Sequence, residues 1–109
     1  MVFRFDYGEH SSLFTSDIYT YSETKLRELY TGGELDADMM KVPHHGIGQS
    51  SLEFIQAVSP EIAVATGYHV IDSDITSRYA AENVTLLEDI YHGYIHIASG
   101  TDGIMSVET

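Results

Sequence analysis

The sequence contains no cysteine, so disulfides, thiolate zinc sites and cysteine nucleophiles are all excluded. It also lacks any hydrophobic run near the roughly 20 residues that a membrane-spanning helix needs. Basic residues are scarce, because 5 Lys and Arg stand against 17 Asp and Glu, which gives a formal net charge of −12. Such a surface repels phosphate backbones, and no basic stripe is present, so the segment is not expected to bind nucleic acid.

The residues that are present describe one small globular unit. The 109 residues are 43% hydrophobic and include no low-complexity tract, which is typical of a folded domain or of one piece of a larger domain. Apolar and polar residues alternate over residues 1–8, which predicts a strand, and residues 12–15 form the second strand of a hairpin. Residues 38–42 and 61–66 are short apolar runs that predict two further strands.

Helix signals lie between and after these strands. Capping-box spacing at Thr20 and Glu23 predicts a helix over residues 21–30, and the same spacing at Ser50 and Glu53 predicts a second helix. Residues 38–66 therefore form a strand–helix–strand unit whose two strands are expected to be parallel. The rest is interpreted as a long polar loop (67–79), a third helix (81–91) and a terminal hairpin that turns at Asp102 and Gly103. The predicted fold class is α/β, with about three helices packed on a mixed sheet.

Polar residues of unusual type follow two of the predicted strands. Asp17 comes shortly after residues 12–15, and His44 and His45 come after residues 38–42, directly behind Pro43. Functional groups in parallel α/β sheets collect beyond the carboxyl ends of strands, so the carboxylate and an imidazole are expected to meet at one edge if the strands are neighbours. Carboxylate oxygen and imidazole nitrogen together suit Zn²⁺, Mn²⁺ or Fe.

Each candidate also has a simpler interpretation. An aspartate after a strand is most often a turn or cap residue, and a His-His pair beside proline and glycine is most often part of a polar loop. His69 lies in the predicted loop and is a weaker candidate ligand. The other histidines are assigned structural places, namely a hairpin turn (His10), a helix C-terminus (His92) and a strand interior (His96).

Two long segments resemble the C-terminal half of a metallo-β-lactamase-superfamily domain. They read "MVFRFDYGEHSSLFTSDIYTYSETKLREL" and "LDADMMKVPHHGIGQSSLEFIQAVSPEIAVATG". The chain is most similar to the hydrolase domain of bacterial competence (DNA-uptake channel) proteins and their relatives. In that group a hairpin ending in Thr-Gly-Asp precedes a helix and a Lys-Val-x-His-His-Gly motif. The last residues, "TDGIMSVET", match the terminal hairpin of that domain, so the resemblance covers nearly the whole chain.

The resemblance implies roles for particular residues. Asp17 falls on the bridging metal carboxylate of the family, and the pair His44 and His45 falls on its last metal histidine, with the choice between the two left open. The implied architecture is a four-layer αββα sandwich of which residues 1–109 are the C-terminal half. The implied cofactor is zinc, two ions in the full-length domain, with manganese or iron as alternatives. The main metal motif of the family, His-x-His-x-Asp-His, is absent from these residues.

The leading hypothesis is a fragment of a metal-dependent hydrolase that acts on phosphodiester or related ester bonds of a small-molecule or polymer substrate. Its catalytic and metal-binding residues are Asp17, His44 and His45. The acidic surface favours a substrate with a cationic group over DNA. The isolated fragment is expected to be inactive, because a hydrolytic zinc site takes three or more ligands from the protein.

The rival hypothesis is a non-catalytic binding or scaffold module of the same shape. It is favoured by Ser16, where the family has glycine, and by Ala81, where the DNA-uptake group has histidine. Two chains are also expected to be able to pair through an exposed sheet edge. The sequence leaves the cell compartment open.

Overall fold

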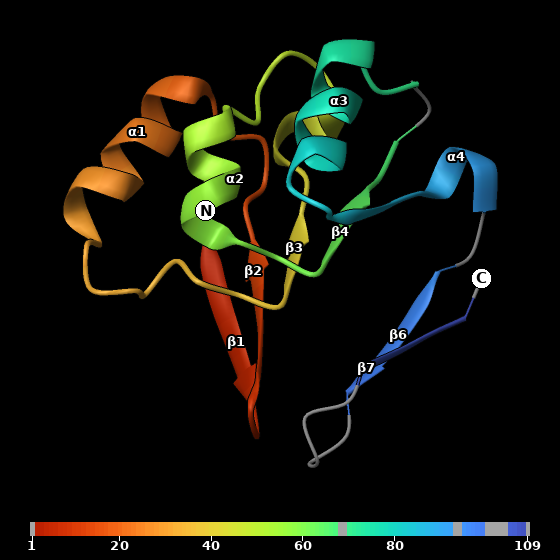
Figure 1. The fold of residues 1–109 in the computed structure, drawn as a ribbon, viewed down its shortest axis with the longest axis horizontal. Helices are drawn as coiled ribbons and strands as arrows, with labels where there is room; N and C mark the ends of the chain where they lie inside the picture. The colour runs from red at the N-terminus through yellow and green to blue at the C-terminus, as the bar shows by residue number, and fades with distance from the viewer. Residues whose placement is uncertain (1, 68–69, 93–94, 100–104, 109) are drawn as a thin grey trace.

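A five-stranded mixed sheet forms the centre of the computed structural model, which describes residues 2–67, 70–92, 95–99 and 105–108 (Figure 1). Its strands lie side by side in the order of the chain. They are β1 (Phe3–Tyr7), β2 (His10–Phe14), β3 (Met39–Lys41), β4 (Ile62–Ala65) and β5 (Thr85–Glu88). β1 pairs antiparallel with β2, and β2 to β5 are parallel, which confirms the predicted mixed α/β class.

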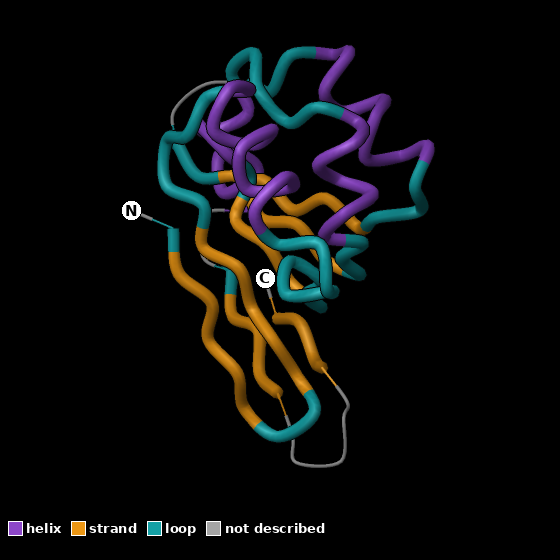
Figure 2. The backbone as a smooth tube through the Cα atoms, turned by 90° about the vertical axis from the view of Figure 1, so that its left-hand side faces the viewer, coloured by secondary structure: helices purple, strands orange, loops and turns teal. Residues whose placement is uncertain are grey.

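Three helices connect the parallel strands and lie together on one face of the sheet (Figure 2). They are α1 (Thr20–Leu29), α2 (Leu52–Val58) and α3 (Ser73–Ala81). Two shorter elements follow strands, a 3-10 turn η1 (Pro43–Gly46) after β3 and α4 (Asp89–His92) after β5. Among the helices in the described ranges, none is long and apolar enough to cross a bilayer.

The strand–helix–strand unit over residues 38–66 is confirmed. β3 and β4 pair in parallel with Met39 opposite Ile62 and Lys41 opposite Val64, and α2 forms the crossover between them. Side chains alternate along β3, so Met40 is fully buried while Met39 and Lys41 are only partly buried. β3 ends at Lys41, so the histidine pair that follows lies at the carboxyl edge of the sheet.

Two predictions for the second half of the chain were wrong. The expected loop at residues 67–79 contains most of α3, which begins after Asp72 and buries Ile75 and Tyr79, four residues apart on one face. The expected helix at residues 81–91 is the strand β5 followed by α4. The apolar residues of this segment fit both helical and alternating spacing. The segment forms a strand because it pairs with the neighbouring strand β4.

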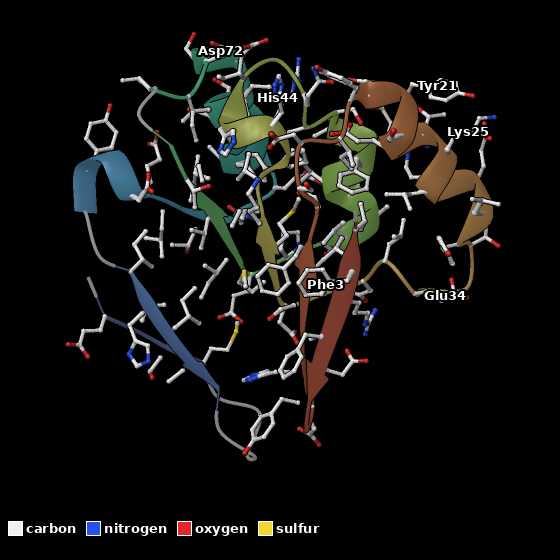
Figure 3. All side chains as sticks on the ribbon, turned by 180° about the vertical axis from the view of Figure 1, so that it is seen from behind. Phe3, Tyr21, Lys25, Glu34, His44 and Asp72 are labelled. Atoms are coloured by element: carbon white, nitrogen blue, oxygen red, sulfur yellow. The ribbon has the colours of Figure 1, made fainter. Side chains whose placement is uncertain are left out.

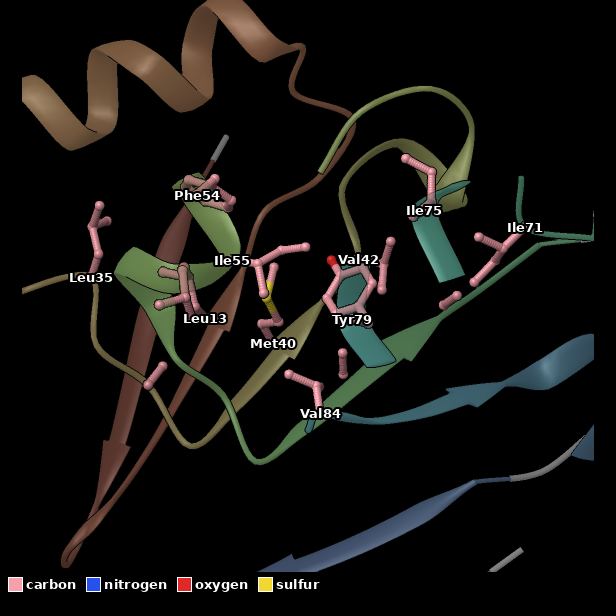
Figure 4. Close-up of a cluster of buried hydrophobic side chains, with 14 residues drawn as sticks. Leu13, Leu35, Met40, Val42, Phe54, Ile55, Ile71, Ile75, Tyr79 and Val84 are labelled. Carbon is pink, nitrogen blue, oxygen red and sulfur yellow. The ribbon is translucent and has the colours of Figure 1, made fainter. Parts of the chain in front are cut away.

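The hydrophobic core fills the space between the sheet and the helical layer (Figure 4). Tyr79, Phe54, Met40 and Ile55 are among its largest fully buried side chains. The Tyr79 ring stands in the middle of the cluster, and its hydroxyl lies 3.0 Å from Ser50 Oγ. The core therefore holds the start of α2, and with it the loop that follows the histidine pair.

Both predicted capping boxes are replaced by a different arrangement. Tyr19, not Thr20, is the N-cap of α1 and makes no side-chain cap bond, whereas Ser51, not Ser50, caps α2 by accepting a bond from Phe54 N. Glu23 is fully buried, and its carboxylate accepts backbone N–H bonds from Ser50 at 2.8 Å and Ser51 at 2.9 Å. A side chain of α1 thus satisfies the amide groups that precede α2.

The predicted terminal hairpin is present as a separate two-stranded sheet of β6 (His96–Ser99) and β7 (Met105–Glu108). The expected turn at Asp102 and Gly103 lies outside the described residues. Ile97 of β6 and Met105 of β7 line a cavity together with Phe14 and Met39 of the five-stranded sheet. The edge strand β1 exposes three aromatic side chains, Phe3, Phe5 and Tyr7, and the last two line this cavity.

Candidate metal centre

The carboxyl ends of the four parallel strands form one rim that carries the candidate residues. Asp17 follows β2, His44 and His45 follow β3, and Thr66 follows β4. Figure 3 shows His44 at the same end of the molecule as Asp72, in the loop after β4. The rim is where ligands bind in parallel α/β sheets.

The structure brings Asp17 and His45 together. Asp17 Oδ1 lies 3.2 Å from His45 Nε2. Lys41 Nζ lies 3.7 Å from the same carboxylate oxygen and donates hydrogen bonds to the carbonyl oxygens of Ser16 at 3.2 Å and Val42 at 3.3 Å. One carboxylate oxygen thus faces an imidazole and an ammonium group from the next strand.

The opposite side of the His45 ring is fixed by the end of β4. His45 Nδ1 lies 2.6 Å from the Thr66 carbonyl oxygen and 3.3 Å from Thr66 Oγ1. A carbonyl oxygen can only accept, so the short bond requires a proton on Nδ1. With its proton on Nδ1, the neutral form of the ring has its Nε2 lone pair directed toward Asp17, and this is the form that binds metals.

His44 takes part in a different set of contacts. Its Nδ1 donates to the carbonyl oxygen of Ile47 at 3.2 Å, and its ring meets the ring of Tyr19 edge-on, with 5.2 Å between centroids. The sequence alone left open which histidine pairs with Asp17, and the geometry places His45 beside the carboxylate.

An unusual backbone presents these side chains. Ser16, His44 and His45 all have left-handed conformations, with φ of 55°, 51° and 57°. This costs a non-glycine residue of the order of 1 kcal/mol. The Ser16 carbonyl oxygen accepts bonds from both His44 N and Lys41 Nζ, each at 3.2 Å, and these bonds tie the two loops together.

The remaining histidines lie elsewhere. His10, expected in a hairpin turn, is the first residue of β2 and is buried, with no partner for its Nδ1 among the described residues. His96 lies within β6 as expected. The weaker candidate His69 and the side chain of His92 fall outside what the structure describes.

Sequence reasoning missed three polar groups at this rim, namely Lys41, Thr66 and Asp89. Thr66 stands directly after β4 and Lys41 ends β3, so strand-end position alone could have identified both. Asp89 was missed because β5 was interpreted as part of a helix. In the described part of the chain, no three His, Asp or Glu side chains group closely enough to hold a metal ion.

Comparison with known proteins gives a distant bacterial relationship. No family model matches the chain. It is 34% identical over 110 residues to the competence protein ComA of Neisseria gonorrhoeae, covering 94% of this chain. It is 27% identical over 108 residues to the uncharacterized protein YcaI of Escherichia coli (strain K12), again covering 94% of this chain. The chain spans only 16% and 14% of the lengths of these relatives, so the similarity to ComA is distant and covers a small part of each.

Proposed function

We propose that Asp17 and His45 are protein ligands of a divalent metal ion in a hydrolase that cleaves phosphodiester or related ester bonds. The observation that carries this proposal is the 3.2 Å separation between Asp17 Oδ1 and His45 Nε2 at the rim of the sheet. Carboxylate oxygen and imidazole nitrogen are ligands that catalytic zinc sites use, and manganese and iron accept the same set. We assign the histidine role to His45, because His44 faces Ile47 and Tyr19.

The geometry of the pair fits two corners of a zinc tetrahedron. With metal–ligand bonds of about 2.1 Å and tetrahedral angles, two ligand atoms lie about 3.4 Å apart, close to the observed 3.2 Å. The bond from His45 Nδ1 to the Thr66 carbonyl oxygen supplies the outer support that metal-binding histidines usually have. Donor type, separation and ring orientation therefore agree with one another.

The chain's own residues have separable roles in this proposal. Asp17 contributes negative charge and His45 a neutral nitrogen donor, and the metal, when bound, acts as a Lewis acid and activates water. Lys41 adds a positive charge 3.7 Å from the carboxylate, which favours an anionic group such as a phosphodiester at the same rim. The net charge of −12 argues against extended DNA as the substrate of this segment.

Two ligands do not complete a catalytic zinc site, which takes three or more from the protein. Because the chain corresponds to 16% of the competence relative, we propose that the other ligands belong to another segment of a longer protein. In the superfamily that the sequence resembles, they are the His-x-His-x-Asp-His motif. The 109 residues alone are then expected to bind zinc weakly and to have no hydrolase activity.

The rival function is a non-catalytic binding or scaffold module, and one observation favours it. Asp17 already faces the Lys41 ammonium as well as His45, so the carboxylate has a positive partner without any metal. A closed cluster of this kind needs no cofactor. It predicts a complete protein that folds normally, contains no zinc and is inactive.

The test uses the complete gene product. Zinc content and hydrolysis of bis-p-nitrophenyl phosphate are measured for the wild type, Asp17→Asn and His45→Ala, with His44→Ala as the matched control. We expect Asp17→Asn and His45→Ala to lose bound zinc. Their hydrolysis rates should fall by more than roughly 100-fold, which is the loss expected when a metal ligand loses only its hydrogen-bond partner. The control should stay within a few-fold of the wild type. Unchanged zinc content and rate in Asp17→Asn would contradict the ligand assignment.

A further inference from the structure

The peptide bond between Thr66 and Gly67 is hydrogen-bonded at both of its ends. Its carbonyl oxygen, on Thr66, accepts the bond from His45 Nδ1 at 2.6 Å. Its N–H, on Gly67, donates to the Asp89 carboxylate, with 3.0 Å to Oδ1 and 3.3 Å to Oδ2. One planar unit therefore joins a carboxylate after β5 to the imidazole after β3.

The charge on Asp89 acts along this unit. A carboxylate that accepts from a peptide N–H polarises the peptide and makes its carbonyl oxygen a stronger acceptor. The stronger acceptor holds the proton on His45 Nδ1 and fixes the plane of the ring. Nε2 is then directed at Asp17, 3.2 Å away. Carboxylate support of a ligand histidine is usually direct, whereas here it passes through one peptide.

Gly67 gives this peptide a backbone conformation that favours glycine. Its φ of +133° is one that side-chain-bearing residues rarely adopt. A Cβ at this position would lie 3.4–3.5 Å from Cβ, Cγ and Nδ1 of His45. Such a Cβ would make ordinary contacts with the ring, so the backbone conformation and not the space beside His45 favours glycine here.

We propose that Asp89 is a positioning residue for His45, acting through the Thr66–Gly67 peptide. Its effect on the orientation of the His45 ring needs no metal. Its effect on the affinity for zinc rests on the proposed function. The two effects are measured separately.

The first experiment uses the metal-free 109-residue chain and NMR. Asp89→Asn is compared with the wild type and with Glu88→Gln, which removes the same charge one residue earlier and leaves the Gly67 bond in place. The wild type should show a low-field His45 Nδ1 proton signal. Asp89→Asn should move that signal and the Gly67 amide proton to higher field, whereas Glu88→Gln should leave both in place. Unmoved signals in a folded Asp89→Asn chain would overturn the proposal.

A second measurement keeps the test decisive if Asp89→Asn does not fold. In the wild-type chain, scalar coupling across the hydrogen bond should connect His45 Nδ1 to the Thr66 carbonyl carbon. Its absence would overturn the proposal, whatever the variants do.

The last measurement is the zinc affinity of the complete protein, obtained by chelator competition. Asp89→Asn should weaken it by about 10-fold, the lower end of what loss of a ligand's outer partner costs, and Glu88→Gln should leave it unchanged. If the NMR changes occur but neither Asp89→Asn nor Asp17→Asn alters zinc binding, the proposed function fails and the positioning of His45 stands. If Asp17→Asn alone weakens binding, the link from Asp89 to the metal is refuted.

Discussion

Replacing Glu23 by alanine should destabilise the chain more than any change on the exposed side of α1. Glu23 is fully buried, and its two carboxylate oxygens accept the backbone N–H groups of Ser50 and Ser51. Those amides precede α2, and within the described part of the chain this side chain is their hydrogen-bond partner. Alanine therefore leaves two buried or part-buried donors without an acceptor, in a space that the side chain no longer fills.

The expected magnitude follows from those two donors. An unsatisfied buried N–H costs about 1–3 kcal/mol, so the pair should lower the free energy of unfolding by roughly 3 kcal/mol. For a chain of this size each kcal/mol corresponds to about 4–8 °C, so the melting temperature should fall by roughly 12–24 °C. Glu23→Gln keeps one acceptor oxygen and should cost about half as much.

Urea denaturation followed by far-UV circular dichroism measures this directly. The matched control is Glu28→Ala, which removes the same charge from the exposed face of α1 and breaks only a surface pair with Lys25, 3.3 Å apart. Such a pair contributes about 0.5 kcal/mol or less. If Glu23→Ala and Glu28→Ala had equal unfolding free energies, the idea that Glu23 satisfies the start of α2 would be refuted.

Three further changes have definite expected outcomes. Ser16→Gly should stabilise the chain by about 0.5 kcal/mol in the same urea assay, because relief of the left-handed φ of 55° exceeds the entropy that glycine loses on folding; a loss of stability would count against strain at this turn. Gly46→Ala should cost about 2–4 kcal/mol, since its φ is +80° and a Cβ would lie 2.6 Å from Ile71 Cγ1; a neutral result would show that Ile71 moves freely. Burial raises the pKa of Tyr79 well above its usual value, so its stabilising contribution is complete below about pH 10 and falls as the pH rises above that value. Tyr79→Phe should flatten this alkaline loss of stability, and an unchanged pH profile would exclude Tyr79 as its source.

Local signals predicted the first half of the fold well. Alternation in β1, a short apolar run bounded by proline, and a serine near the start of α2 were enough to place the strand–helix–strand unit. They were sufficient because each signal agrees with the tertiary structure at that point. The capping boxes were assigned to the wrong residues, since the sequence does not show that Glu23 turns inward to bind another helix.

The second half depended on pairing that the sequence does not display. Val84, Leu87 and Tyr91 have helical spacing, but Leu86 lies opposite Ala63 of β4, and the sheet takes this segment as a strand. The error had a consequence for the site, because it hid Asp89 at the end of that strand. Strand assignment and site assignment therefore failed together.

For the site itself, strand-end position predicted that the carboxylate and an imidazole would meet, and Asp17 and His45 do. The choice between His44 and His45 could not be predicted. It depends on the left-handed conformations of His44 and His45, which direct the two rings to different partners. His44 bonds to Ile47, and His45 bonds to Thr66. Such conformations are uncommon for residues other than glycine, and nothing in the sequence "PHHG" requires them.

Anomalous diffraction from crystals of the complete protein grown with zinc would show whether Asp17 and His45 bind one metal ion. We expect a zinc peak within about 2.0–2.2 Å of both an Asp17 carboxylate oxygen and His45 Nε2. A zinc-soaked crystal with no peak at this rim, and with the Lys41 ammonium still beside Asp17, would contradict it.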